Sequence, residues 1–191
     1  MWPNYAKCKT RRELGGALEM VNRRKKQCWP EFCDDGEPLK VSAITDLLKG
    51  LDANWPTLAC KSGGKSLEFW SYEWKKHGTC SGLGQHGYFS AALGFKARHN
   101  LTAILAGARI VPSHDATYFL SSIMDAIKEG TGFAANLECN RGAGGETQLF
   151  QVYQCVDRAG KRLIDCPQRM PGNCRDRCSC RPSDLIKLQR G

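Results

Sequence analysis

Eleven cysteines in 191 residues constrain this chain more than any other feature of its sequence. They are scattered, and no Cys-x-x-Cys pair recurs at zinc-finger spacing, so the pattern favours disulfide bonds over a metal site. The odd number leaves at least one thiol over. Disulfides persist in oxidising compartments, and the glycosylation sequon at Asn100 also fits a secreted protein.

From the first residues of the sequence we expect no signal peptide. Met1 is followed directly by Trp-Pro-Asn, without the basic head and apolar run of a signal peptide. No stretch approaches the ~20 apolar residues that cross a bilayer, so we expect a soluble protein without membrane contact. The cysteine content of a secreted protein therefore stands beside an expected absence of a signal peptide.

The net charge of +9 has two interpretations. Lysines and arginines concentrate in residues 7–26 and 169–190. Charge alone favours two solvated segments. The alternative is electrostatic attraction for the phosphates of RNA.

The order of apolar patterns predicts an α+β fold. Helical spacing runs from Ile44 to Leu51, and similar patterns cover residues 13–23, 68–77, 87–97, 101–106 and 118–129. Short β-prone runs follow at 135–140, 147–157 and 161–167, and they resemble an antiparallel meander. Without a repeat or a linker, we expect one domain over 1–174 and a basic, cysteine-rich tail at 175–191. The chain from Pro167 onward is expected to be irregular.

The segment "LEFWSYEWKKHGTC" groups a carboxylate, an ammonium and an imidazole on one turn. If it is helical, Tyr72, Glu73, Lys76 and His77 span an arc of about 140°. An exposed Glu–His pair four residues apart is common decoration on helices, which is the ordinary alternative. The surrounding aromatic residues favour a functional site.

The same segment supplies its own anchors. Trp70 and Trp74 are adjacent on the helix and are expected to hold it in the core, and Gly78 stands where a C-terminal cap would lie. The polar group suits attack on phosphate, because an imidazole transfers protons and a lysine stabilises charge on phosphoryl oxygens. In RNA the ribose 2′-hydroxyl supplies the nucleophile, so no metal is needed, but two proton-transfer groups are.

This segment closely resembles the second active-site segment of the ribonuclease T2 family, best matched by plant S-like members, which reads F-W-S-H-E-W-x-K-H-G-T-C. Further matches occur in the family's order over roughly Cys28 to Cys174 and at residues 1–5. They are "MWPNY", "ANWPTLAC", "GYFSAAL", "IKEGTGF", "ECN", "QLFQVYQCVD" and "LIDCP".

The resemblance implies a central antiparallel sheet flanked by helices, and cleavage of single-stranded RNA through a 2′,3′-cyclic phosphate without cofactor or metal. His77 resembles an acid–base histidine, and Glu73 and Lys76 resemble the pair that stabilises the pentacoordinate phosphate. Trp2, Asn4 and Phe69 resemble base contacts, since aromatic faces hold unstacked bases; a frayed terminus is the alternative for Trp2. We expect a monomer, extracellular or vacuolar by family resemblance.

The family also implies disulfide pairs. Cys33–Cys80, Cys139–Cys174 and Cys155–Cys166 resemble family bridges. Cys60 would pair upstream of the active site. The remaining cysteines fall outside the family's scheme, with a Cys8–Cys28 bridge and a metal site at Cys174, Cys178 and Cys180 as alternatives.

Two departures from the family predict a severely impaired enzyme. The family's other acid–base histidine belongs two residues before Met1, and its leading strand belongs upstream as well. Tyr72 replaces a phosphate-binding histidine, and a phenol is neutral at pH 7. Losing one proton-transfer group costs on the order of 10²–10⁴ in rate. Three hypotheses follow: a ribonuclease sequence missing its N-terminus, a non-catalytic RNA-binding or storage homologue, or a product that does not fold stably.

Overall fold

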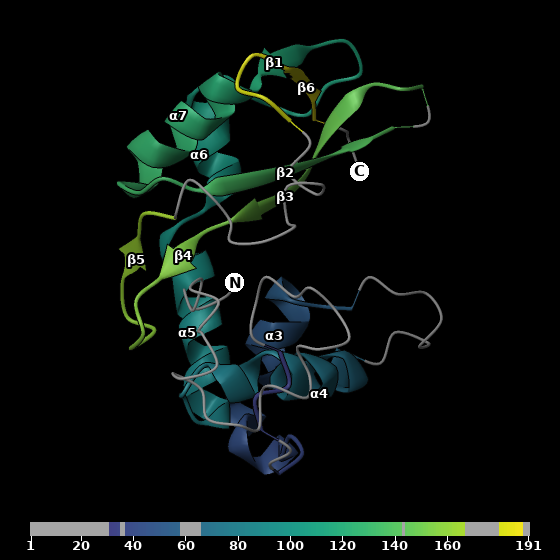
Figure 1. Cartoon of the computed structure of the whole chain (residues 1–191). Helices are drawn as coiled ribbons and strands as arrows, with labels where there is room; N and C mark the ends of the chain where they lie inside the picture. The colour runs from purple at the N-terminus through teal and green to yellow at the C-terminus, as the bar shows by residue number, and fades with distance from the viewer. Residues whose placement is uncertain (1–30, 35–36, 58–65, 143, 167–179, 189–191) are drawn as a thin grey trace. The chain divides into compact units, whose positions relative to one another are not determined.

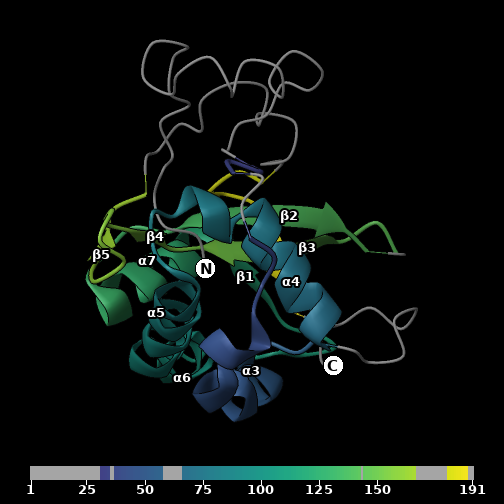
Figure 2. The same ribbon diagram turned by 90° about the horizontal axis from the view of Figure 1, so that it is seen from below.

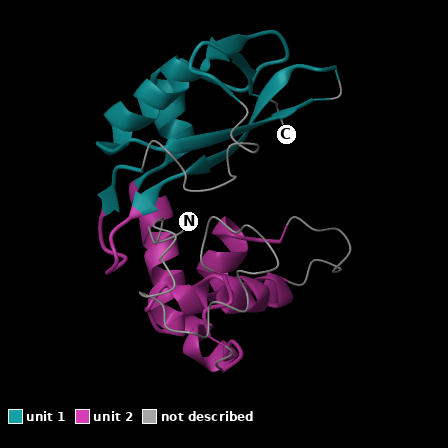
Figure 3. Ribbon diagram, in the orientation of Figure 1, with its two compact units in different colours: residues 1, 99–155, 163–191 teal, residues 2–98, 156–162 magenta. Residues whose placement is uncertain are grey.

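The computed structural model describes residues 31–34, 37–57, 66–142, 144–166 and 180–188 (Figure 1). Within these ranges no helix is both long and apolar enough to cross a membrane. The described chain divides into two compact units, coloured separately in Figure 3. One contains residues 2–98 and 156–162, and the other contains residues 99–155 and 163–191 together with residue 1.

The first unit is helical and carries the motif of interest. Two short 3₁₀ turns, η2 (Val41–Ala43) and η3 (Thr45–Leu47), lead into α3 (Leu48–Asn54). Helix α4 (Ser66–Lys76), the 3₁₀ turn η5 (Gly78–Cys80) and helix α5 (Gln85–Arg98) follow (Figure 2). The helices pack on an aromatic core, because indole and phenyl rings bury large apolar areas. That core consists of Ile44, Leu51, Trp70, Trp74, Tyr88 and Phe89.

The second unit packs two helices against a sheet. Helices α6 (Leu101–Gly107) and α7 (Leu120–Thr131) contact each other, and a four-stranded sheet has the order β1-β6-β3-β2. The long strands β2 (Asn136–Arg141) and β3 (Thr147–Tyr153) pair antiparallel. Strand β6 (Leu185–Lys187) pairs antiparallel with β1 (Thr117–Phe119) and parallel with β3 at one residue pair. A further two-stranded sheet joins β4 (Cys155–Val156) to β5 (Leu163–Ile164).

The predicted α+β class is confirmed, with local corrections. The pattern at 118–129 is a helix only from Leu120, because Tyr118 belongs to β1, where it pairs with Ile186. The run at 147–157 breaks at Gln154 into β3 and β4, so the strands do not form one continuous meander. The helix expected at 13–23 lies outside the described residues.

The sequence suggested that the C-terminal segment is irregular throughout. The structure corrects this, because the segment contains strand β6. Ile186 on β6 is fully buried, and it belongs to the core that also contains Ile123 and Ile127 of α7. The backbone amide of Leu120 donates to the carbonyl of Asp184, which fixes the turn before β6 against the start of α7. The boundary proposed at residue 174 stays a prediction.

One implied disulfide is wrong. Cys139 of β2 is bonded to Cys180, with 5.7 Å between their Cα atoms, and not to Cys174. The reason is the unforeseen strand β6, which enters the sheet beside β3 and carries the preceding Cys180 towards β2. The structure confirms the other two implied pairs, Cys33–Cys80 and Cys155–Cys166.

Candidate active site on helix α4

Two buried tryptophans position α4. Trp70 and Trp74 are 2% and 8% exposed, as their helical spacing suggests. The indole Nε1 of Trp70 donates to the carbonyl of Trp55 at 2.8 Å, so the one polar atom of the ring is satisfied. The anchored face fixes the rotation of the helix. Residues Tyr72, Glu73 and Lys76 are therefore carried on its less buried side.

Glycine at position 78 allows close packing. It does not form the C-terminal helix cap that the sequence suggested. The helix does not end in a left-handed glycine cap, because the chain continues into η5. A Cβ atom on Gly78 would instead overlap the six-membered ring of Trp74, with Cζ3 at 2.8 Å. Glycine is needed here because the indole lies against the backbone.

His77 is buried at the junction of α4 and η5, with an exposed fraction of 7%. Its backbone amide donates to the carbonyl of Glu73 at 2.9 Å, which continues the helical pattern. Burial, followed by the charge of Lys76, lowers the pKa of the imidazole to about 3. His77 is therefore neutral at pH 7, the form that accepts a proton.

Glu73 lies one turn before His77 and is half-buried. Burial raises the pKa of its carboxyl, the Lys76 charge opposes this rise, and Glu31 adds to it. The pKa of the Tyr88 phenol is raised by burial and by the charge of Glu73. Tyr88 thus belongs to the electrostatic surroundings of Glu73, although the sequence analysis did not include it.

Residues 31–33 line the end of α4, and of these the sequence analysis included Cys33 but missed Glu31 and Phe32. An oxygen of the Glu31 carboxylate lies 3.3 Å from the Lys76 ammonium. The amide of Phe32 donates to the carbonyl of Lys76 at 2.8 Å, and Cys33 is bonded to Cys80. Because that disulfide was implied, the approach of Glu31 to Lys76 could have been inferred from it.

The pKa of the Lys76 ammonium reflects the nearby Glu31. Burial lowers the pKa of the ammonium, but the charge of Glu31 and the phenol of Tyr72 raise it, and the net shift is upward. The ammonium lies 5.5 Å from the centre of the Tyr72 ring, at cation–π distance. Lys76 is therefore a cation with two fixed neighbours.

The predicted aromatic contacts differ in exposure. Tyr72 is 50% exposed, and its ring meets Phe32 edge to face at 6.3 Å. Phe69 is half-buried and packs edge to face on Trp55 at 6.1 Å, so part of its surface serves the core. Phe32 has φ of 52°, which is rare for a bulky residue and typical of constrained sites.

Several predicted residues lie outside the described ranges, namely Trp2, Asn4, Cys8, Cys28, Cys60, Cys174 and Cys178. Asn100 is exposed, and its side chain accepts a hydrogen bond from the amide of Ala103, which caps α6. Among the other histidines, His86 and His114 are exposed, and His99 is half-buried. His86 lies 3.0 Å from Asp46.

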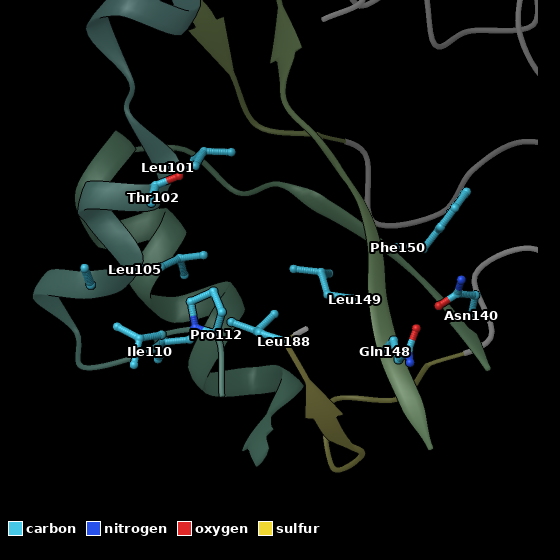
Figure 4. A pocket seen from close by; sticks show the side chains of 12 residues that line it. Leu101, Thr102, Leu105, Ile110, Pro112, Asn140, Gln148, Leu149, Phe150 and Leu188 are labelled. Carbon is cyan, nitrogen blue, oxygen red and sulfur yellow. The ribbon is translucent and has the colours of Figure 1, made fainter. Parts of the chain in front are cut away.

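A cavity of about 400 Å³ between α6 and β3 contains none of the predicted site residues (Figure 4). Its lining is mainly apolar, with Leu105 and Ile110 near the helix and Leu149 on the strand. Across the described part of the chain, no three histidine, cysteine or acidic side chains gather as metal ligands do. Cys180 is committed to a disulfide, which argues against the alternative metal site in the tail.

The sequence matches the profile of the Ribonuclease T2 family over residues 17–166. Ribonuclease 1 of Arabidopsis thaliana is 43% identical over 176 residues, which are 91% of this chain and 67% of that protein. Intracellular ribonuclease LX of Solanum lycopersicum is 42% identical over 167 residues, 87% of this chain and 62% of the relative. The chain thus spans about two thirds of the length of these curated relatives.

The fold has solved counterparts. The crystal structure of RNase NT in complex with 5′-AMP superposes with a TM-score of 0.72 at 41% identity. The match covers 84% of this chain and 75% of that one. Sequence and fold therefore agree on the same family.

Proposed function

Because this chain belongs to the ribonuclease T2 family, we propose that it acts on single-stranded RNA and cleaves it through a 2′,3′-cyclic phosphate. The observation that carries the proposal is the grouping of Glu73, Lys76 and His77 on the last turn of α4 and the residue after it, with His77 buried and neutral.

Each side chain has a role that its surroundings support. His77 accepts the proton of the ribose 2′-hydroxyl as the 2′ oxygen bonds to phosphorus. Lys76 neutralises charge on the phosphoryl oxygens. Glu73, whose pKa is raised by burial, donates a hydrogen bond to phosphate when it is protonated. The P–O5′ bond then breaks, and the departing oxygen takes a proton from a second donor or from water.

We propose that cleavage by the 191-residue chain is slow. The family's second proton-transfer histidine has no counterpart among this sequence's four histidines, of which His77 is the one in the site motif. Tyr72 stands where the family has a further histidine, so a phenol replaces an imidazole at this position. One of the two proton transfers therefore lacks its histidine, and one positively charged contact to the phosphate is lost.

Assay of a defined single-stranded oligonucleotide tests this function. The full chain should release a product with a 2′,3′-cyclic phosphate, identified by mass spectrometry. H77A should cleave about 10²–10⁴-fold more slowly. H86A is the matched control, since His86 is exposed and pairs with Asp46, and it should cleave like the parent. Equal cleavage by H77A and the parent would exclude the proposed role of His77.

A second candidate is a non-catalytic RNA-binding or storage protein, which Tyr72 favours. A relative from Panax ginseng, 30% identical over 140 residues, is named a ribonuclease-like storage protein. This candidate predicts RNA binding that weakens steeply with salt, and no cyclic phosphate. The same oligonucleotide, titrated at several salt concentrations, separates the two functions.

We also propose an oxidising location, extracellular or vacuolar. The disulfides support it, because such bonds are rare where thiols are kept reduced. Relatives in the family are named both extracellular and intracellular ribonucleases. Detection of the protein in cell-wall or vacuolar fractions would test the location.

A further inference from the structure

Lys76 already has an anionic neighbour where the proposed function requires a phosphate. The Glu31 carboxylate lies 3.3 Å from the ammonium, and the two side chains are 18% and 24% exposed. We infer that Glu31 is a built-in counter-ion that competes with substrate phosphate for Lys76 and so lowers the site's affinity for phosphate. The inference rests on the proposed role of Lys76 as the phosphate contact.

Three contacts hold Glu31 in place. The amide of the next residue, Phe32, donates to the carbonyl of Lys76, and the Phe32 ring packs edge to face with Tyr72. The following residue, Cys33, is bonded to Cys80 beyond the end of α4. Glu31 is thus attached to the helix terminus that carries Lys76, and little further entropy is lost when the ion pair forms.

The charges around Lys76 explain why the competition matters. The Glu31 carboxylate lies 3.3 Å from the Lys76 ammonium and offsets its charge. His77 is neutral at pH 7, so it adds no charge. Glu73 on the same helix also interacts electrostatically with Lys76 and with Glu31. A phosphate that approaches Lys76 therefore meets a neutral ion pair, and it must displace Glu31 or share the ammonium with it.

The inference is tested by phosphate binding, without any cleavage. Inorganic phosphate and 5′-AMP serve as probes, titrated into the full oxidised chain by calorimetry at fixed ionic strength. E31Q keeps the shape of the side chain and removes its charge. It should bind phosphate about two- to five-fold more tightly, the range expected for release of a partly exposed ion pair.

E37Q is the matched control. Glu37 lies in the same segment and also pairs with a lysine, Lys40, but both side chains are largely exposed. The change in net charge is identical, so a general charge effect would appear in both variants. The affinity of E37Q should equal that of the parent.

A double-mutant cycle shows whether Glu31 acts through Lys76. In the K76Q background, E31Q should give no further gain in affinity. Unchanged or weaker phosphate binding by E31Q, or a gain that persists in K76Q, would overturn the inference. If E31Q does not unfold cooperatively, E31D replaces it, because the shorter side chain withdraws the carboxylate and should give a smaller gain. Absence of RNA cleavage would contradict the proposed function and leave this result standing.

Discussion

The indole of Trp74 lies against the backbone of Gly78, so closely that a Cβ on the glycine would overlap the ring. This contact joins the buried face of α4 to the turn that contains Cys80. Because His77 lies between the two elements, the contact also fixes the position of the candidate base. Packing and chemistry are therefore linked at this point of the chain.

Substitution of Gly78 by alanine should destabilise the protein by about 1–3 kcal/mol, since either the ring or the backbone must move. Urea unfolding at pH 7 would measure the loss. The control is G107A in α6, where an added Cβ meets nothing within 4 Å. That variant should be unchanged or more stable by about 0.4–1 kcal/mol. Equal effects of the two substitutions would contradict the packing argument.

The stability of the fold should depend on His77 in acid. An unfolded histidine has a pKa of about 6.5, and burial lowers the pKa of folded His77 to about 3. Between these values the unfolded state binds more protons, so stability falls as the pH decreases from 6.5 towards 3. Thermal unfolding across this range should show a shallower decline in H77Q than in the parent. H86Q, altered at an exposed site, should follow the parent; parallel curves for H77Q and the parent would contradict the shift.

Tyr72→His should increase RNA cleavage. A protonated histidine would bring a positive hydrogen-bond donor to the phosphate, and charged hydrogen bonds support an increase of about ten-fold. The increase should be larger at pH 5.5 than at pH 7.5, because the new imidazole is charged at the lower pH. Initial rates on the same oligonucleotide would measure it. Y72F removes only the hydroxyl, and Y72H cleaving no faster than Y72F would argue against a phosphate contact at this position.

The C-terminal strand should contribute to stability. Ile186 is fully buried and Leu185 beside it is 52% exposed, which gives a matched pair on one strand. I186A should lose about 2–5 kcal/mol of unfolding free energy. L185A should lose far less, and urea denaturation compares the two directly. A small effect of I186A would mean that β6 is dispensable.

The sequence predictions were correct where residues close together in the chain determine the structure. Spacing alone located α4 and identified Trp70 and Trp74 as buried. The same reasoning assigned Gly78 to a cap, because a sequence shows that glycine is present but not which ring lies against it. Glycine at a helix end has both uses, and the coordinates distinguish them.

Long-range contacts account for the errors. Strand β6 is short and follows a polar, basic stretch, so its own sequence gives little sign of a strand. Pairing with β1 and β3 and the burial of Ile186 stabilise it, and both are long-range contacts. The partner of Cys139 depends on that strand. Glu31 lies near Lys76 because the Cys33–Cys80 disulfide joins two segments that are distant in the sequence. The spacing of residues along the chain could not indicate this ion pair.

The bridge between Cys139 and Cys180 has a practical consequence for anyone who handles this protein. A protease that cuts the backbone once between these residues leaves two fragments held together by sulfur. The nicked protein would migrate as one species on a non-reducing gel and as two after treatment with thiol. Apparent integrity without reductant is therefore no proof of an uncut chain.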